Sequence, residues 1–384
     1  MKFACVELYT KSGKIWDGAR EKPNYLCDPR EIDNASFGCW TSALKGEHVP
    51  LLWFKFRKPM RKLYHSLLAP RMSRFNYAGY SLISRLFNRA FEDFHNLEYL
   101  SKFDVILVVV HDYSIRAMAK FVTAAKKLQK RPIILGAFGV TLNFMREALK
   151  DQEKFKYFKI FIDNCEIFVN YYHEAISDYL KLYTNTPIVN FPQFYPYEFA
   201  KSFFVPRREK EKVIFVSGHT QRTDHVASLL IAKKIQERYP DFLIEVIGRP
   251  KHNLEPLKES KFKVIPFSRL WVDYLRNTCK AYITIDMDNT WTLGRVVRDS
   301  AVVGTPCIGL NSGSQKILFP ELACSDITDT KKAIELGVKL IENGEFYENI
   351  QQKAFKRLED CSFENSVKRL NAVLKNYTEN MFTA

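Results

Sequence analysis

Runs of aliphatic residues recur along the chain, and between them apolar residues are spaced three or four positions apart, the period of an amphipathic helix. In the first half the apolar runs are residues 2–8, 49–56, 104–110, 132–136, 165–170 and 187–191. The helical patterns between them cover about 32–44, 115–129, 142–159 and 174–183. Runs such as DVILVVV at 104–110 have the composition of parallel strands buried on both faces. This half is therefore predicted to be an α/β unit with a parallel sheet.

The second half repeats this alternation. Its apolar runs are residues 213–216, 242–248, 262–266, 281–285 and 307–310, and helical patterns cover about 224–239, 271–277, 295–303, 330–343 and 346–374. Between the halves, the segment FPQFYPYEFAKSFFVPRREKEK (191–212) contains three prolines and many charges, as linkers do. A length of 384 residues suits two domains. We expect two Rossmann-like domains, residues 1–204 and 205–384.

Residues 280–321 show the repeating unit most clearly. A buried strand at 281–285 leads into a polar loop broken by Gly294, then a helix, a Gly-Thr-Pro stop and a second apolar strand at 307–310. Such a unit favours parallel pairing with a right-handed crossover. Free backbone N–H groups at the start of its helix would point at an anion. Our hypothesis is that this turn holds the phosphates of a nucleotide-sugar.

Composition favours a folded protein without a membrane span or a disulfide framework. Apolar residues make up 46% of the chain, and the longest aliphatic run, 105–110, is far shorter than the roughly 18 residues that cross a bilayer. The N-terminus has no apolar signal-peptide core, so a cytoplasmic location is expected. The eight cysteines are scattered and form no C-x-x-C pair. They are expected to be free thiols, and no metal site is predicted.

The net charge of +15 predicts an anionic partner: nucleic acid, an acidic membrane face or a phosphorylated substrate. From residue 48 to 91 there are nine Lys or Arg residues and no Asp or Glu. Within this stretch, residues 55–90 interleave basic and apolar side chains at roughly helical spacing, as segments that lie on anionic lipid do. Peripheral membrane binding through residues 55–90 is one interpretation, and a surface helix with solvated charges is the other.

Several short motifs follow one another along the chain, and their order is informative. They are Leu44 with GEHV at 46–49, FDVILVVVHD at 103–112, the strands that end at Gly218 and Gly248, and Gly304-Thr305-Pro306 with Gly313. In this order, and over most of the chain, the motifs resemble the large retaining, metal-independent family of GT-B glycosyltransferases, family four. The resemblance implies two Rossmann-like domains that face each other across a cleft. It also implies a nucleotide-sugar as co-substrate and no cofactor.

The same resemblance exposes a departure in the donor site. The family usually has two glutamates eight positions apart, and these positions fall on Trp291 and Asp299. Asp299 keeps a carboxylate that can accept hydrogen bonds from the ribose hydroxyls. Trp291 cannot accept hydrogen bonds, although its ring could stack on a base or sugar. Asp286 and Asp288 lie just upstream and could replace the missing carboxylate.

A diphosphate leaving group needs positive charge, which without a metal falls to basic side chains and helix N-terminal amides. The candidates are Arg222, Arg249, Arg295 and Arg298. For each of them the alternative is a solvated surface arginine. Gly218, His219 and Gly294 lie in the turns that would approach the donor, and for Gly294 the alternative is a plain turn glycine.

Acceptor residues are expected in the first domain. His111 and Asp112 end a buried strand, and the resemblance suggests that a histidine here contacts the transferred sugar or the acceptor. The alternative is a structural histidine with satisfied hydrogen bonds. Four residues of the first loop, Lys14, Trp16, Asp17 and Arg20, are placed near acceptor or donor phosphate by position alone.

The resulting prediction is a glycosyltransferase that moves a sugar from a nucleotide-sugar to a glycan or lipid-linked acceptor. His111, Asp112 and Arg222 are its predicted catalytic residues. Gly218, His219, Arg249, Trp291, Gly294, Arg295 and Asp299 are its predicted donor-binding residues. Two alternatives stay open. The high positive charge would also suit a GT-B glucosyltransferase of modified DNA bases, and Trp291 would suit a GT-B-like binding protein without transfer activity.

Overall fold

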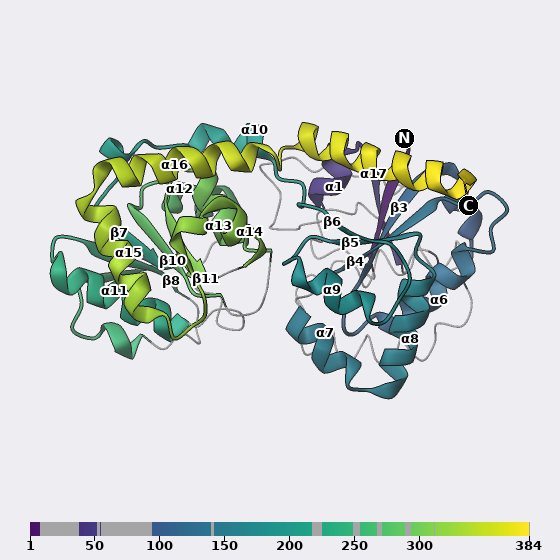
Figure 1. Ribbon diagram of the computed structural model, residues 1–384, viewed down its shortest axis with the longest axis horizontal. Coiled ribbons are helices and arrows are strands. Elements are labelled where there is room, and N and C mark those ends of the chain that lie inside the picture. The colour runs from purple at the N-terminus through teal and green to yellow at the C-terminus, as the bar shows by residue number, and fades with distance from the viewer. Residues whose placement is uncertain are drawn as a thin grey trace. The chain divides into compact units, whose positions relative to one another are not determined.

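The computed structural model describes residues 1–7, 38–51, 54, 94–139, 142–216, 225–248, 254–266, 271–288, 293–310 and 312–383 (Figure 1). They divide into two compact units. The first contains the described residues of 1–170 and 174–193, and the second contains residues 171–173 and those from 194 onward. Each unit is built around one parallel sheet of six strands.

The first sheet has the strand order β2-β1-β3-β4-β5-β6. Its strands are β1 (Phe3–Glu7), β2 (Glu47–Pro50), β3 (Val105–Val110), β4 (Ile133–Phe138), β5 (Ile167–Asn170) and β6 (Ile188–Asn190). All five pairings are parallel, which confirms the predicted sheet. The strand predicted at 49–56 is wrong in its extent, because β2 ends at Pro50 and Leu51 is already helical. A proline ring offers no N–H to continue a ladder.

Among the described residues, the helices of the first unit are α1 (Gly38–Ala43), the 3₁₀ helix η1 (Leu97–Lys102), α6 (Ile115–Ala125), α7 (Leu142–Leu149), α8 (Gln152–Asp163) and α9 (Ala175–Lys181). One helix was predicted over 142–159, but the structure has two. Asp151 explains the break, because its side chain accepts a 3.0 Å hydrogen bond from the backbone N–H of Lys154 and so begins α8 as its N-cap.

Aromatic side chains pack helices on both faces of the first sheet. Phe158 of α8 stacks on Phe138 of β4 at 5.8 Å between ring centroids. On the opposite face, Trp40 of α1 stacks on Phe3 of β1 at 6.2 Å. Side chains of successive strand residues point to opposite faces. Residues 3, 5 and 7 of β1 therefore share the face that α1 covers.

The second sheet has the order β12-β11-β10-β7-β8-β9. Its strands are β7 (Val213–Val216), β8 (Leu243–Gly248), β9 (Phe262–Pro266), β10 (Ile283–Asp286), β11 (Cys307–Leu310) and β12 (Ala323–Cys324). Counted within the unit, this is the 3-2-1-4-5-6 order of dinucleotide-binding folds, read from the other edge. The predicted strands at 213–216 and 307–310 have the observed bounds.

The larger helices of the second unit are α11 (His225–Arg238), α12 (Trp271–Thr278), α13 (Arg295–Val302), α15 (Thr330–Glu342), α16 (Gly344–Glu359) and α17 (Phe363–Thr383). Shorter helices are α10 (Tyr197–Ala200), η2 (Lys201–Phe203), η3 (Arg207–Glu209), η4 (Glu255–Leu257), α14 (Gly313–Leu318) and η5 (Pro320–Leu322). The helical pattern predicted over 346–374 corresponds to two helices, since residues 360–362 separate α16 and α17.

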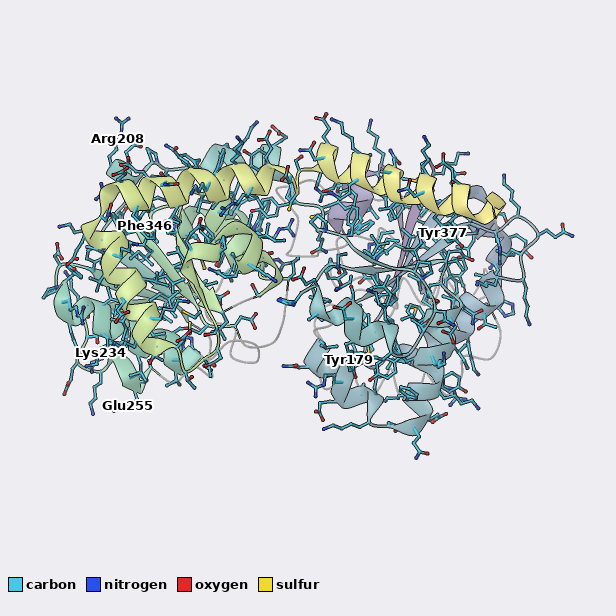
Figure 2. All side chains as sticks on the ribbon, viewed as in Figure 1. Tyr179, Arg208, Lys234, Glu255, Phe346 and Tyr377 are labelled. Atoms are coloured by element: carbon cyan, nitrogen blue, oxygen red, sulfur yellow. The ribbon has the colours of Figure 1, made fainter. Side chains whose placement is uncertain are left out.

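Helices α11 and α15 lie side by side on one face of the second sheet (Figure 1). Gly337 makes this approach possible, because a Cβ atom there would lie 2.4 Å from Cδ1 of Ile235. Charged residues point outward: Arg208 and Lys234 extend away from the ribbon of this unit (Figure 2). The unit thus has an apolar interior and a charged surface, as expected of a folded domain.

The proline-rich segment after residue 193 is packed into the second unit. Phe194, Tyr195 and Tyr197 are all buried. The backbone N–H of Tyr195 donates a 2.9 Å hydrogen bond to the carbonyl of Cys361. Farther on, Nζ of Lys210 donates to the carbonyls of Cys279 and Val303 and to Oγ1 of Thr305, at 2.8, 2.9 and 2.8 Å. Its aromatic residues make the segment part of the core, whereas its composition suggested a linker.

Candidate functional site

Strand order indicates where each unit would bind a ligand. In the first sheet the strand order reverses between β1 and β3, because β2 is added on one side of β1 and the later strands are added on the other. In the second sheet the strand order reverses in the same way between β7 and β10. Open parallel sheets bind ligands outside the carboxyl ends of the strands at such a switch point. The two candidate sites are therefore the residues that follow β1 and β3, and those that follow β7 and β10.

At the first switch point, three neighbouring strands bring together one carboxylate and two imidazoles. Oε2 of Glu7, at the end of β1, lies 3.0 Å from Nε2 of His48 on β2. Oε1 of Glu7 lies 3.6 Å from Nε2 of His111, directly after β3. The register explains the meeting, because Cys5 pairs with both His48 and Leu107. Side chains of paired residues share a face, so Glu7, His48 and His111 point the same way.

The two histidines keep Glu7 ionised. Burial alone would raise the pKa of this carboxyl group, but the close contacts and charge interactions with His111 and His48 outweigh it and lower the pKa to about 2. Glu7 is therefore a carboxylate at any physiological pH. An ionised carboxylate only accepts hydrogen bonds, so it favours a proton on the ring nitrogen that faces it.

The ring of His111 is held from several sides. Tyr113 stacks on it at 5.0 Å between centroids and an interplanar angle of 15°. Gly139 follows β4 in register with His111, and a Cβ atom there would lie 2.3 Å from Cε1 and Nε2 of the ring. The backbone N–H of His111 donates to Oγ of Ser114 at 2.9 Å. The position therefore requires glycine at 139 and leaves His111 little freedom to turn.

Sequence reasoning singled out His111 and Asp112 but missed Glu7 and assigned no role to His48. Glu7 ends the apolar run FACVE of β1, just as His111 ends the run of β3. A charged residue at the carboxyl end of a central strand was the available signal. The predicted residue Asp112 lies beside this group, and its Oδ1 is buried and makes no hydrogen bond in the part of the chain that the structure describes.

At the second switch point, Gly294 precedes α13 in a left-handed conformation, with φ of 75°. Only glycine suits this position, since a Cβ atom would also lie 2.6 Å from Oγ of Ser312. Ser312 caps α14 by accepting from the backbone N–H of Gln315 at 3.2 Å. The first N–H groups of a helix have no partner within the helix. The start of α13 thus places backbone N–H groups at the carboxyl edge of the sheet.

Asp286 ends β10 at the same switch point. It is 3% exposed, and its Oδ1 has no hydrogen-bond partner in the described part of the structure. Burial, followed by the nearby charge of Asp288, raises the pKa of Asp286 well above its usual range. A buried carboxyl oxygen without a hydrogen bond is costly to a fold, and ionisable groups with strongly shifted pKa values are common at functional sites. Asp286 is therefore a stronger candidate than its position in the sequence suggested.

Asp299 is 1% exposed and serves as an anchor inside the second unit. Its Oδ1 accepts hydrogen bonds from the hydroxyl of Tyr195 at 2.8 Å and from Nε1 of Trp271 at 3.1 Å. Burial raises the pKa of Asp299 to about 6, against opposing effects of Arg295, Tyr195, Trp271 and Arg298. The guanidinium of Arg298 lies over the ring of Tyr195, 4.6 Å from its centroid. A ribose role for Asp299 stays a prediction.

Several predicted site residues lie outside the described residues: Gly218, His219, Arg222, Arg249, Trp291, the first-loop residues Lys14, Trp16, Asp17 and Arg20, and the basic segment 55–90. Of the predicted set, the structure describes His111 and Asp112 in the first unit and Gly294, Arg295, Arg298 and Asp299 in the second. Their predicted roles stay predictions.

Two further observations concern metals and membranes. Among the described residues, no group of three or more His, Cys, Asp or Glu side chains has an arrangement that could hold a metal ion. None of the helices in the described ranges combines the length and the apolar character that crossing a bilayer demands.

No protein-family model and no curated protein sequence matches the chain. Solved structures do match it. Sucrose-phosphate synthase from Thermosynechococcus elongatus has a TM-score of 0.54 at 13% identity, over 80% of this chain and 81% of that one. The UDP-forming α,α-trehalose-phosphate synthase from Burkholderia vietnamiensis has a TM-score of 0.54 at 10% identity, over 86% and 88%.

The pneumococcal O-GlcNAc transferase GtfA, solved with UDP and GlcNAc, has a TM-score of 0.51 at 9% identity and matches over 73% of this chain and 59% of that one. At such low identities the likeness concerns the fold and not the chemistry. It agrees with the strand orders of the two sheets. The chain therefore has the α/β fold of the GT-B glycosyltransferases, with two Rossmann-like units.

Proposed function

We propose that the protein is a glycosyltransferase that moves a sugar from a nucleotide-sugar donor to a hydroxyl group of a glycan or lipid-linked acceptor. The start of α13 carries the proposal: Gly294, in a left-handed conformation, precedes a helix at the switch point of a sheet with dinucleotide-binding strand order. The N-terminus of a helix in that place suits a diphosphate, because backbone N–H groups there point at an anion. The shared fold with sugar-transferring enzymes supports this reading.

The donor is assigned to the second unit. Negative charge develops on the diphosphate as its bond to the sugar breaks, and preorganised donors stabilise that charge. The first turn of α13 would supply N–H groups and Arg295 a positive charge, with Arg222 and Arg249 added from outside the described residues. Retention of configuration and independence from metal ions belong to the proposal through the resemblance of the motifs.

The acceptor is assigned to the first unit. His111 and Glu7 lie at the carboxyl edge of the first sheet, where a ligand of a parallel sheet is expected. An imidazole and a carboxylate together can orient a hydroxyl group by hydrogen bonds. Hydroxyl-bearing acceptors therefore suit the side chains that meet at this edge.

The basic segment 55–90 supports a further part of the proposal, which is docking on anionic membranes. Its arginines and lysines would meet acidic headgroups while its apolar residues enter the interface. We expect the protein to co-sediment with vesicles that contain phosphatidylglycerol and not with pure phosphatidylcholine. Replacing Arg57, Lys58, Arg61 and Lys62 by Gln should abolish co-sedimentation, and unchanged binding would contradict the assignment.

A thermal-shift screen with UDP, GDP, ADP and their sugar conjugates tests the proposal, because a ligand that binds the native state raises the melting temperature. One nucleotide class should raise it by several degrees at about 100 times its Kd, the equivalent of about 2.7 kcal/mol. No response to any of them would overturn the proposal. A response without sugar transfer would instead identify a binding protein, and salt-sensitive binding to duplex DNA would favour a DNA-modifying enzyme.

A further inference from the structure

Each oxygen of the Glu7 carboxylate faces a different imidazole. Oε2 meets Nε2 of His48 at 3.0 Å, and Oε1 meets Nε2 of His111 at 3.6 Å. The side chains of Glu7, His48 and His111 are 14%, 4% and 7% exposed. Because they come from three adjacent strands of one sheet, their spacing is set by the backbone ladder and not by flexible loops.

The charge of Glu7 decides which nitrogen of each histidine carries a hydrogen. A carboxylate has acceptors only, so a stabilising contact requires an N–H on the nitrogen that faces it. For His111 that nitrogen is Nε2. In a neutral imidazole the other nitrogen then has a free lone pair and is an acceptor. In His111 this hydrogen-bond acceptor is therefore Nδ1.

The residues packed around His111 disfavour the alternative orientation of its side chain, in which the imidazole ring is flipped. Tyr113 lies nearly parallel to the ring, and Gly139 approaches the edge that contains Cε1 and Nε2. Close packing on a face and on an edge restricts rotation of the ring. The packing thus fixes the plane of the ring, and the carboxylate fixes its proton.

We propose that Glu7 is a positioning residue that holds His111 with its proton on Nε2, so that Nδ1 accepts a hydrogen bond from the hydroxyl group of the sugar acceptor. The part that concerns the acceptor rests on the proposed glycosyltransferase function. The part that concerns Glu7 and His111 rests on the geometry of the first unit alone. His48 lies against the second oxygen of Glu7, and this contact keeps the carboxylate from turning away from His111.

The test uses the full chain with ¹⁵N-labelled histidine and a long-range ¹H–¹⁵N correlation spectrum. The His111 signals are assigned by their loss in His111→Gln, and the buried His173 serves as an internal control. In spectra recorded at a pH at which the imidazole of His111 is neutral, we expect the wild type to show its proton on Nε2. In Glu7→Gln, where an amide N–H₂ can replace an oxygen, His111 should change its tautomer while the His173 signals stay unchanged.

A wild-type His111 with its proton on Nδ1 would overturn the proposal, and so would a folded Glu7→Gln protein with an unchanged tautomer. A merely structural Glu7 would lower the melting temperature without altering the tautomer. If Glu7→Gln does not fold, the wild-type tautomer still decides the question, and Glu7→Asp provides the second variant. The His173 signals report folding in each sample.

A second measurement, nucleotide binding by Glu7→Gln, distinguishes a failure of this inference from a failure of the proposed function. Glu7→Gln should leave the thermal shift caused by UDP or another responding nucleotide unchanged, because the donor is assigned to the second unit. It should lower kcat of sugar transfer on the order of 10²-fold, as misplacing a reacting group does, with KM for the donor unchanged. An unchanged kcat would refute the acceptor role. Absence of any nucleotide response, with the expected tautomer, would refute only the glycosyltransferase function.

Discussion

The hydroxyl of Tyr195 donates a 2.8 Å hydrogen bond to Oδ1 of Asp299, which joins the segment that enters the second unit to helix α13. The two residues are 104 positions apart in the sequence. Trp271 shares the same oxygen at 3.1 Å, so one buried carboxyl group connects three segments of the chain. Asp299 is thereby a structural anchor, whatever part it takes in donor binding.

Asp299 should make stability depend on pH in a specific direction. Its folded-state pKa is raised to about 6, so between about pH 4 and pH 6 the native protein binds more protons than the unfolded chain. The contribution of Asp299 to stability is therefore full at pH 4 and is lost as the pH rises through 6. Relative to Asp299→Asn, the wild type should lose on the order of 2 kcal/mol between pH 4 and 7 in urea unfolding. A difference between the two proteins that stays constant over this range would contradict the assignment.

Lys210 should be among the most important lysines for stability. Burial lowers its pKa to about 7, and its Nζ donates to two backbone carbonyls and to Thr305 Oγ1. Lys210→Met leaves these acceptors unsatisfied and should cost about 2–4 kcal/mol in urea unfolding at pH 6. The matched control is Lys212→Met, because Lys212 pairs with Asp241 on the surface and should change stability by less than about 1 kcal/mol. Equal effects of the two variants would refute the anchoring role of Lys210.

Asp286→Asn should stabilise the protein at neutral pH. The raised pKa of this buried carboxyl, whose Oδ1 has no hydrogen-bond partner among the described residues, means that ionisation opposes folding above the usual range of an aspartate, so stability falls as pH rises there. Removing the ionisable group should add about 1 kcal/mol or more at pH 7, while the exposed Asp178→Asn should have little effect. Stabilisation with weaker nucleotide binding, measured by calorimetry, would place Asp286 in the donor site. A loss of stability at pH 7 would show that the carboxyl has a partner.

Gly294→Ala should destabilise the second unit and weaken nucleotide binding. The substitution forces a Cβ into a left-handed residue and against Oγ of Ser312, and should cost about 1–3 kcal/mol in chemical unfolding. Gly344→Ala is the control, because the backbone at Gly344 is not left-handed and the atoms nearest to a Cβ there belong to the guanidinium of Arg207. Should Gly294→Ala match this control in both stability and affinity, the backbone at the start of α13 has no special role.

Local patterns in the sequence predicted most of the strands and their parallel arrangement. The runs at 213–216 and 307–310 became β7 and β11 because a fully buried parallel strand is apolar throughout and turn residues bound it. Breaks inside helical patterns were missed where one side chain decides them. Asp151, which caps α8 within a continuous amphipathic pattern, is the clearest case.

The site was less predictable, because its contacts depend on strand order. His111 was identified from the end of one strand, but its partner Glu7 lies on another strand that becomes its neighbour only in the β2-β1-β3 order. The same holds for Asp299, whose partners Tyr195 and Trp271 come from distant segments. Periodicity carries no information about such pairings, whereas register in the finished sheet determines them.

Release of a nucleoside diphosphate from nucleotide-sugars is the most direct test of the central claim. The full chain should release UDP, GDP or ADP from one donor class in a coupled assay, faster with a glycan or lipid acceptor, and Gly294→Ala should reduce the rate at least about 10-fold while Gly344→Ala retains it. No release above that of heat-denatured protein, from any donor and with any acceptor, would contradict the claim that the protein is a glycosyltransferase.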